Sequence, residues 1–220
     1  MERHARPSSD RPPEQPDRLA DPRQLRRAVA TAALLNFGYF FVEFSVALVA
    51  GSVALLADSV DFLEDTAVNL LILLALGWPL ARRAVAGKVM ALVILGPAAV
   101  AAWEAVQRFA DPAAPDVAPI VWASLGAIAV NGTSAWLLAR VRHHGGSLSR
   151  AAFLSARNDV LVNLAIIVMA VVTAGTGSGW PDLILGTLVI LLALHAAREV
   201  WEVSEEERLA AKALAGEPID

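Results

Sequence analysis

The sequence predicts an all-α membrane protein with six transmembrane helices and both termini in the cytoplasm. The first observation is composition: 56% of the 220 residues are hydrophobic, whereas soluble domains average about 45–50% even when glycine is counted. The second is a series of six apolar stretches, each near the ~20 residues that a helix needs to cross a bilayer. The third is that basic residues gather on one side of these stretches. Only helices satisfy their own backbone in lipid at this composition, so the spans are helical.

The predicted spans follow one another through short connections marked by Gly, Pro and charged residues. They cover about 27–50, 54–79, 87–109, 118–140, 150–174 and 181–203. Residues 1–25 are rich in Pro, Arg and Asp, which predicts a disordered cytoplasmic tail and not a secretory signal peptide. Residues 205–220 predict a short C-terminal cytoplasmic tail, so the transmembrane domain occupies 26–204.

Orientation follows from the lysines and arginines. They are frequent in the N-terminal tail, after the second and fourth spans, and after the sixth span. Beyond the N-terminal tail this side carries Arg82, Arg83, Lys88, Arg140, Arg142, Arg150, Arg198, Arg208 and Lys212. The other side has only Arg108. The positive-inside rule therefore places both termini in the cytoplasm, as an even number of spans requires.

Composition also limits the partners. The chain has no cysteine, which excludes disulfides and thiolate metal ligands. A net charge of −4 does not suggest a nucleic-acid partner. Membrane lipid is the surrounding that the spans require.

The second span carries four acids within eight positions, Asp58, Asp61, Glu64 and Asp65. At 100° per residue the three aspartates share a stripe roughly 60° wide. Asp61 and Asp65 lie roughly 10–17 Å below the outer edge of the membrane, near its middle. Acids at this depth are costly and usually functional, so this stripe needs partners.

The fifth span supplies a matching acid. Asp159 lies roughly 15 Å into the membrane, with Ser155 one turn before it, Asn158 beside it and Asn163 one turn after it. Two helices thus offer oxygen atoms at one depth, as an ion site between helices requires. Alternatively, these carboxylates are protonated or paired with Arg157 and serve packing.

Other charged residues have simpler interpretations. Glu104 and Arg108 are four residues apart, which predicts a local ion pair. Arg157 points away from Asp159, and it is expected either to extend to the cytoplasmic side or to pair with Glu64 or Glu43. The pair is the favoured interpretation. For Glu43 itself, a contact between helices is favoured over metal ligation.

These residues resemble the cation diffusion facilitators, a family of proton-coupled exporters of divalent transition metals with six transmembrane helices. The run LNFGYFFVEFSVALVAGSVALLADSVDFLED looks like the family's first and second helices, ending in the acidic pair Asp61 and Asp65. WEAVQRFADP looks like the end of its third helix, Asn131 falls where the fourth usually has Asn, and WPDLILGTLVILLAL looks like its sixth. The resemblance implies a multi-pass protein of the bacterial cytoplasmic membrane.

The chain departs from the family pattern in two places. The fifth helix of the family usually carries His or Asp four residues before its Asp, and here Ser155 stands in that position. Most members also continue into a cytoplasmic metal-binding domain that forms dimers, whereas this sequence ends about 17 residues after the last span. A short form without that domain is expected, and a homodimer would have to form through the transmembrane helices.

The predicted site is a metal-ion site and not a catalytic one. The predicted ligands are Asp61, Asp65 and Asp159, completed by Ser155, a water or the Asn158 amide. Asp58, Asn158 and Asn163 are expected around them. The expected cargo is a divalent ion exchanged for protons, and no resident cofactor is expected. Family frequency favours Zn²⁺, while the all-oxygen ligand set favours Mn²⁺, Fe²⁺ or Co²⁺; Cd²⁺ is a further candidate.

Two other classes of protein stay open from the residues alone. In a membrane-embedded metal-dependent enzyme, Asp-x-x-x-Asp can end a phosphotransferase motif, but the upstream Asp-Gly-x-x-Ala-Arg is missing before Asp61. A passive cation channel would be expected to show a ring of ligands or a hydrophobic gate. The transporter is the favoured function.

Overall fold

The computed structural model describes residues 22–141 and 146–216 and consists of six α-helices within these ranges. Their bounds are α1 Pro22–Ala50, α2 Val53–Ala75, α3 Leu80–Phe109, α4 Val117–Ala139, α5 Gly146–Thr176 and α6 Trp180–Ala215. The described residues contain no strand, which confirms the predicted all-α class. The adjacent histidines of the fourth connection, His143 and His144, lie outside the described residues.

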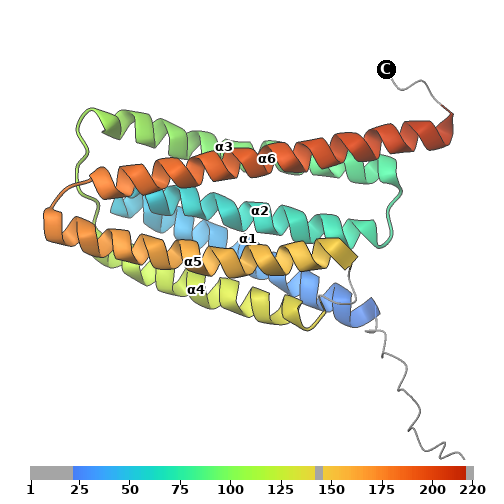
Figure 1. The fold of residues 1–220 in the computed structure, drawn as a ribbon, viewed down its shortest axis with the longest axis horizontal. Helices are drawn as coiled ribbons and strands as arrows, with labels where there is room; N and C mark the ends of the chain where they lie inside the picture. Colours follow the sequence, from blue (N-terminus) through green and yellow to red (C-terminus); the bar gives the residue numbers. More distant parts are fainter. Residues whose placement is uncertain (1–21, 142–145, 217–220) are drawn as a thin grey trace, which may run out of the picture.

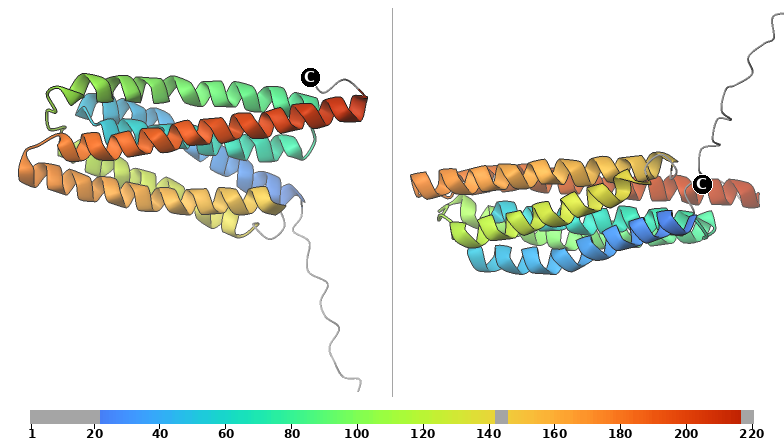
Figure 2. Two further views of the ribbon diagram at one scale, coloured as in Figure 1. Left: turned by 45° about the horizontal axis from the view of Figure 1, so that its top comes forward. Right: turned by 90° about the horizontal axis from the view of Figure 1, so that it is seen from below.

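The helices run up and down in one elongated bundle (Figure 1). Helix α3 lies along α6, and α4 lies along α5, in both views of Figure 2. Helix α2 lies among the others and contacts α1, α3, α5 and α6. The start of α1 and the end of α6 lie at the same end of the bundle, which we call the terminal end. The α1–α2, α3–α4 and α5–α6 connections form the opposite end, which we call the far end.

Helix α2 differs from the other five in hydropathy. The other helices are long and apolar enough to cross a membrane, whereas α2 carries too many acids to qualify by composition. Fifteen of its 23 residues are buried, so most of its surface contacts the surrounding helices and not lipid. Its central place in the bundle explains how a helix with four acids can span a membrane, because intramembrane acids face the bundle interior.

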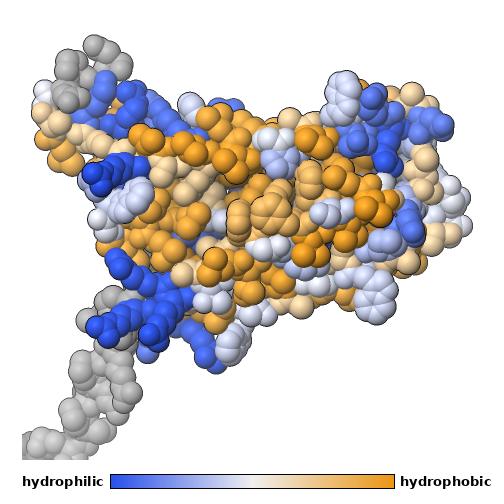
Figure 3. Space-filling model, turned by 180° about the vertical axis from the view of Figure 1, so that it is seen from behind, coloured by the Kyte–Doolittle hydropathy of each residue, from blue (hydrophilic) through white to orange (hydrophobic). Residues whose placement is uncertain are grey.

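The outer surface matches a lipid environment. On the face shown in Figure 3, apolar side chains cover the middle of the molecule and hydrophilic ones gather toward both ends. Large apolar side chains point outward along the helices, including Val49 at 85% exposed, Trp122 at 75% and Leu34 at 72%. A water-soluble bundle would bury such residues, so the surface confirms the multi-pass membrane protein that the sequence predicts.

Helices α3 and α6 extend furthest beyond the apolar stretches that predicted them. Helix α3 begins at Leu80 instead of about 87, and α6 continues to Ala215 instead of ending at about 203. The two extensions lie together at the terminal end and are joined by ion pairs between Arg83 and Glu207 and between Lys88 and Glu205. Hydropathy marks only the part of a helix that lies in lipid, and these charged turns continue the helices beyond it.

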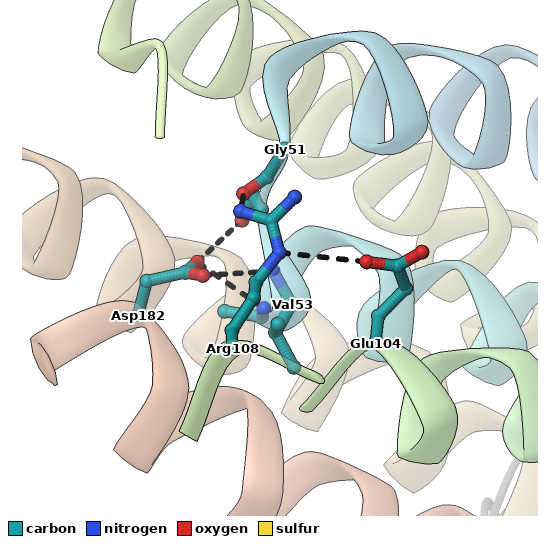
Figure 4. Close-up of polar contacts among 7 residues, drawn as sticks. Gly51, Val53, Glu104, Arg108 and Asp182 are labelled. Atoms are coloured by element: carbon teal, nitrogen blue, oxygen red, sulfur yellow. Dashed lines mark hydrogen bonds and ion pairs between the residues drawn. The ribbon is translucent and has the colours of Figure 1, made fainter. Parts of the chain in front are cut away.

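At the far end of the bundle, Asp182 of α6 binds the first residues of α2 (Figure 4). The Asp182 carboxylate of α6 accepts hydrogen bonds from the backbone N–H of Val53 at 2.8 Å and of Ala54 at 3.2 Å. It also accepts one from the Ser52 hydroxyl at 2.5 Å. A carboxylate at this position satisfies free N–H groups and complements the positive end of the helix dipole. These contacts fix where α2 begins and hence the depth of its acids.

The turn before α2 is held from α3. Gly51 has a φ of 69°, a left-handed conformation that favours glycine, and its carbonyl accepts a hydrogen bond from the Arg108 guanidinium. Arg108 also pairs with Glu104 at 3.5 Å, which confirms the predicted local ion pair. Close packing completes the arrangement, because a Cβ atom at Gly186 of α6 would lie 2.7 Å from the backbone nitrogen of Ala54.

Candidate metal site

Asp65 is the best-defined member of the predicted site. Its side chain is buried on α2 and receives a hydrogen bond on each carboxylate oxygen. The Asn36 amide of α1 donates to Oδ2 at 3.0 Å, and the Ser155 hydroxyl of α5 donates to Oδ1 at 2.9 Å. Ser134 of α4 donates in turn to Asn36 Oδ1 at 3.4 Å. Three helices therefore meet at this one carboxylate, and α4 supports it through Asn36.

The Asp65–Ser155 bond sets the register between α2 and α5. The two helices are antiparallel, so one turn back from Asp65 on α2 corresponds to one turn forward from Ser155 on α5. This step places Asp159 opposite Asp61, and the Asp159 carboxylate lies within electrostatic reach of both Asp65 and Asp61. The next step places Asn163 beside Asp58, and these two side chains are neighbours. The polar residues of α2 and α5 thus form one continuous column.

The four predicted ligands are neighbours but not a closed coordination shell. Within residues 22–141 and 146–216, no three His, Cys, Asp or Glu side chains form a ready-made metal-binding group. Asp61, Ser155 and Asp159 are half-buried, while Asp65 is buried. The side chains supply carboxylate and hydroxyl oxygens only, a chemistry that suits hard or borderline divalent ions.

The residues predicted around the ligands are placed differently from one another. Asn163 is fully buried, and its amide donates to the Asp159 carbonyl at 3.1 Å. Asp58 is 1% exposed and lies beside Asn163. Asn158 instead lies on an exposed part of α5, where it accepts a hydrogen bond from Arg157 at 3.5 Å.

The expected pairing of Arg157 with Glu64 or Glu43 is wrong. Arg157 is exposed and its hydrogen bond goes to Asn158, while the Glu43 oxygens have no hydrogen-bond partner among the described residues. The reason is rotation about α5: the arginine lies on the side away from the column, as its angular distance from Asp159 implies.

Of the two donors that hold Asp65, the sequence predicted Ser155 as part of the site and did not predict Asn36. Asn36 binds Asp65, Ser134 binds Asn36, and the buried Glu43 lies beside Asp58 further along the column. None of these three residues was predicted to contact the site. A signal was available for two of them, because Asn36 and Glu43 are seven residues apart on one face of an otherwise apolar helix. Polar residues at such positions in a membrane helix mark contacts between helices.

The fold and the column define a helical membrane protein whose interior presents carboxylates from facing helices. The chain belongs to the cation efflux family: the family's model, described as the cation efflux transmembrane domain, matches residues 29–205. This finding confirms the resemblance drawn from the motifs, together with the multi-pass location in a bacterial inner membrane. It also favours a transporter over the membrane-embedded enzyme, since the matched domain is one of cation efflux.

Curated relatives carry one name. The chain is 30% identical over 189 residues to the zinc transporter ZitB of Escherichia coli (strain K12), and equally to that of Shigella flexneri. A shorter match, 32% over 111 residues, covers 49% of this chain and 33% of the ZitB of Pectobacterium atrosepticum. The first two matches cover 78% of this chain but 59% of each relative, so the chain spans well under two thirds of their length.

Proposed function

We propose that this chain exports divalent transition-metal ions in exchange for protons, with Zn²⁺ as the favoured cargo. The observation that carries the proposal is the junction at Asp65, where α1, α2 and α5 bring amide, carboxylate and hydroxyl groups together inside a cation efflux domain. Asp61, Asp65, Ser155 and Asp159 are the proposed ligands. The Ser155 hydroxyl donates its hydrogen bond to Asp65, so the lone pairs of its oxygen stay free to coordinate an ion.

Exchange follows from competition for the same oxygens. A carboxylate must lose its proton before it can coordinate a metal ion, so this group of acids holds either protons or metal. Facing the cytoplasm, the site gives up protons and takes the ion; facing outward, it takes protons and releases the ion. Rearrangement of the helices around a site near the middle of the membrane provides the alternation.

Two arguments bear on the identity of the transported ion, and they favour different ions. The ligands are all oxygen atoms, which suits Mn²⁺ or Mg²⁺ better than Zn²⁺, although Zn²⁺ accepts carboxylate ligands. The relatives are named zinc transporters, which supports Zn²⁺. We rank Zn²⁺ first, followed by Mn²⁺, Fe²⁺, Co²⁺ and Cd²⁺. A homodimer through the transmembrane helices remains a prediction.

Metal flux in proteoliposomes with an imposed pH gradient tests this function. Each of the five ions is offered to wild type, to Asp159→Asn and to Glu202→Gln. Glu202 provides the matched control, because it is an exposed acid of α6 that pairs with Arg198 at 2.6 Å, away from the column. We expect gradient-dependent flux in wild type and in the control, and a loss of more than about tenfold in Asp159→Asn.

Two results would contradict the proposal. Accumulation of the ion against its own gradient that persists after the pH gradient is collapsed would exclude proton exchange as the driving step. Equal flux in Asp159→Asn and Glu202→Gln would exclude the column as the metal path.

A further inference from the structure

A second acidic group lies one layer beyond the proposed ligands, toward the far end. Glu43 of α1 is fully buried, Asp58 of α2 is 1% exposed, and the two carboxyl groups are within hydrogen-bonding reach of each other. Their position follows from register: Asn36 meets Asp65, and seven residues further along each antiparallel helix Glu43 meets Asp58. No role in metal binding has been assigned to Glu43.

The atoms of this pair lack hydrogen-bond donors. All four carboxylate oxygens of Glu43 and Asp58 are buried without a hydrogen-bond partner in the described part of the chain. The neighbouring Asn163 is also fully buried, and its Oδ1 atom has no partner either. Asn163 is thus the amide that lies nearest Asp58, and the two carboxylates side by side make no hydrogen bond to each other unless one of them carries a proton.

Among the described residues, no cation is found to act on the pair. The ionisable groups that act on the pair are Asp61 on α2, Asp159 on α5 and Tyr39 on α1. Two of these are acids, and the Tyr39 hydroxyl is already used, since it donates to the Ala123 carbonyl at 2.6 Å. Two buried, adjacent carboxylates among other acids cannot both remain charged, because desolvation and mutual repulsion oppose it.

We propose that Glu43 and Asp58 share one proton and form a proton-binding site separate from the metal ligands. A proton fits this place better than a metal ion, because the carboxyls and Asn163 are packed with at most 1% exposure. The proton supplies the missing O–H donor and lowers the charge of the pair from −2 to −1. It titrates as a property of the pair and not of either residue.

This inference deepens the proposed exchange and its role in transport rests on that function. A divalent ion at Asp61 and Asp159 brings positive charge one layer away from the pair and stabilises its ionised form. The pair then passes its proton to water and becomes fully ionised. By linkage, a proton on the pair weakens metal binding by the same factor. The pair is therefore a second place, beside the ligand carboxylates, where a counter-transported proton resides.

Infrared difference spectroscopy of the purified full chain tests the site without metal. Spectra of wild type and of the double variant Glu43→Gln/Asp58→Asn are compared at neutral pH in H₂O and D₂O. We expect wild type to show the C=O stretching band of a protonated carboxyl, which shifts in D₂O and is lost in the double variant. Glu202→Gln is the control and should leave this band unchanged. If the double variant does not fold, the band must shift or disappear in the single variant Glu43→Gln.

A second measurement connects the pair to the ion. Zn²⁺ and Mn²⁺ are added to weakly buffered protein, and released protons are counted with a pH dye while metal binding is measured by calorimetry. We expect Glu43→Gln to release about one proton fewer per bound ion than wild type, with metal affinity retained within about threefold.

Identical infrared bands in wild type and the folded variants would overturn the proton site. A loss of metal binding in Glu43→Gln without any loss of the band would also overturn it, because the pair would then be metal ligands. Wild type that shows the band but binds no metal would refute the exchange function alone.

Discussion

Asp65 is oriented by donors from two neighbouring helices, and these donors determine where its free lone pairs face. The Asn36 amide holds Oδ2 and the Ser155 hydroxyl holds Oδ1, so the carboxylate cannot rotate without losing one of them. Donors of this kind orient a ligand before the ion arrives and tune its affinity. Asn36 is in turn held by Ser134, which extends the support to α4.

Replacement of Asn36 by Ala tests this support. The change leaves Asp65 Oδ2 buried without its donor, and we expect the free energy of unfolding in detergent to fall by about 1–2 kcal/mol. Ser45→Ala is the control, because Ser45 is an exposed hydroxyl that donates only to the Phe41 carbonyl of its own helix. We expect that control to stay within about 0.5 kcal/mol of wild type. Chemical unfolding of the three proteins side by side provides the measurement, and equal losses in the two variants would contradict the role of Asn36.

The sequence contained the ligand column but not the contacts between its residues. Asp61, Asp65 and Asp159 could be placed at one depth, because depth depends only on helix direction and rise per residue. Which side chain meets which across two helices also depends on rotation and on sub-turn shifts, and these come from packing. For this reason the Asn36–Asp65 bond and the Glu43–Asp58 contact were not predicted, and Arg157 was given the wrong partner.

At the scale of the helix, α2 depends on its neighbours more than on its own sequence. A single carboxylate of α6, Asp182, binds the Ser52 hydroxyl and the N–H groups of Val53 and Ala54. Ser52 completes the cap by accepting from the Leu55 N–H at 3.1 Å. The sequence predicted where α2 begins to within one residue, since Gly51 and Ser52 are ordinary turn and cap signals. It did not predict that a residue about 130 positions away along the chain completes the cap.

The cap can be tested against a weaker one in the same chain. Asp182→Ala removes three hydrogen bonds at a buried helix start, and we expect it to lower the free energy of unfolding by about 2–3 kcal/mol. Asp116 caps α4 through one exposed hydrogen bond of 3.3 Å to the Ala118 N–H, so Asp116→Ala should cost about 0.5–1 kcal/mol. Unfolding curves of both variants, recorded in one detergent, compare the two caps. A cost for Asp182→Ala no larger than that for Asp116→Ala would show that the contact does not stabilise α2.

For the whole molecule, the distribution of charge between the two ends predicts its orientation in the membrane. The terminal end carries basic residues from the start of α1, the start of α3, the end of α4 and the end of α6, whereas the far end carries Arg108 alone among the described residues. Arg108 is also committed to Glu104 and to the Gly51 carbonyl. The positive-inside rule therefore places the terminal end in the cytoplasm, and with it the paired extensions of α3 and α6.

The absence of cysteine makes this orientation directly measurable, because one introduced thiol is the only thiol in the protein. Ala114→Cys places it in the exposed α3–α4 connection at the far end, and Leu214→Cys places it on the last turn of α6, where the side chain is 81% exposed. A maleimide that does not cross membranes should label the first variant in intact cells and the second only after the cells are permeabilised. The two variants control for each other, since both carry an exposed thiol near one end of the same bundle. The reverse labelling pattern would invert the proposed direction of transport, because the layer that holds Glu43 and Asp58 would then lie toward the cytoplasm and the terminal end would face outward.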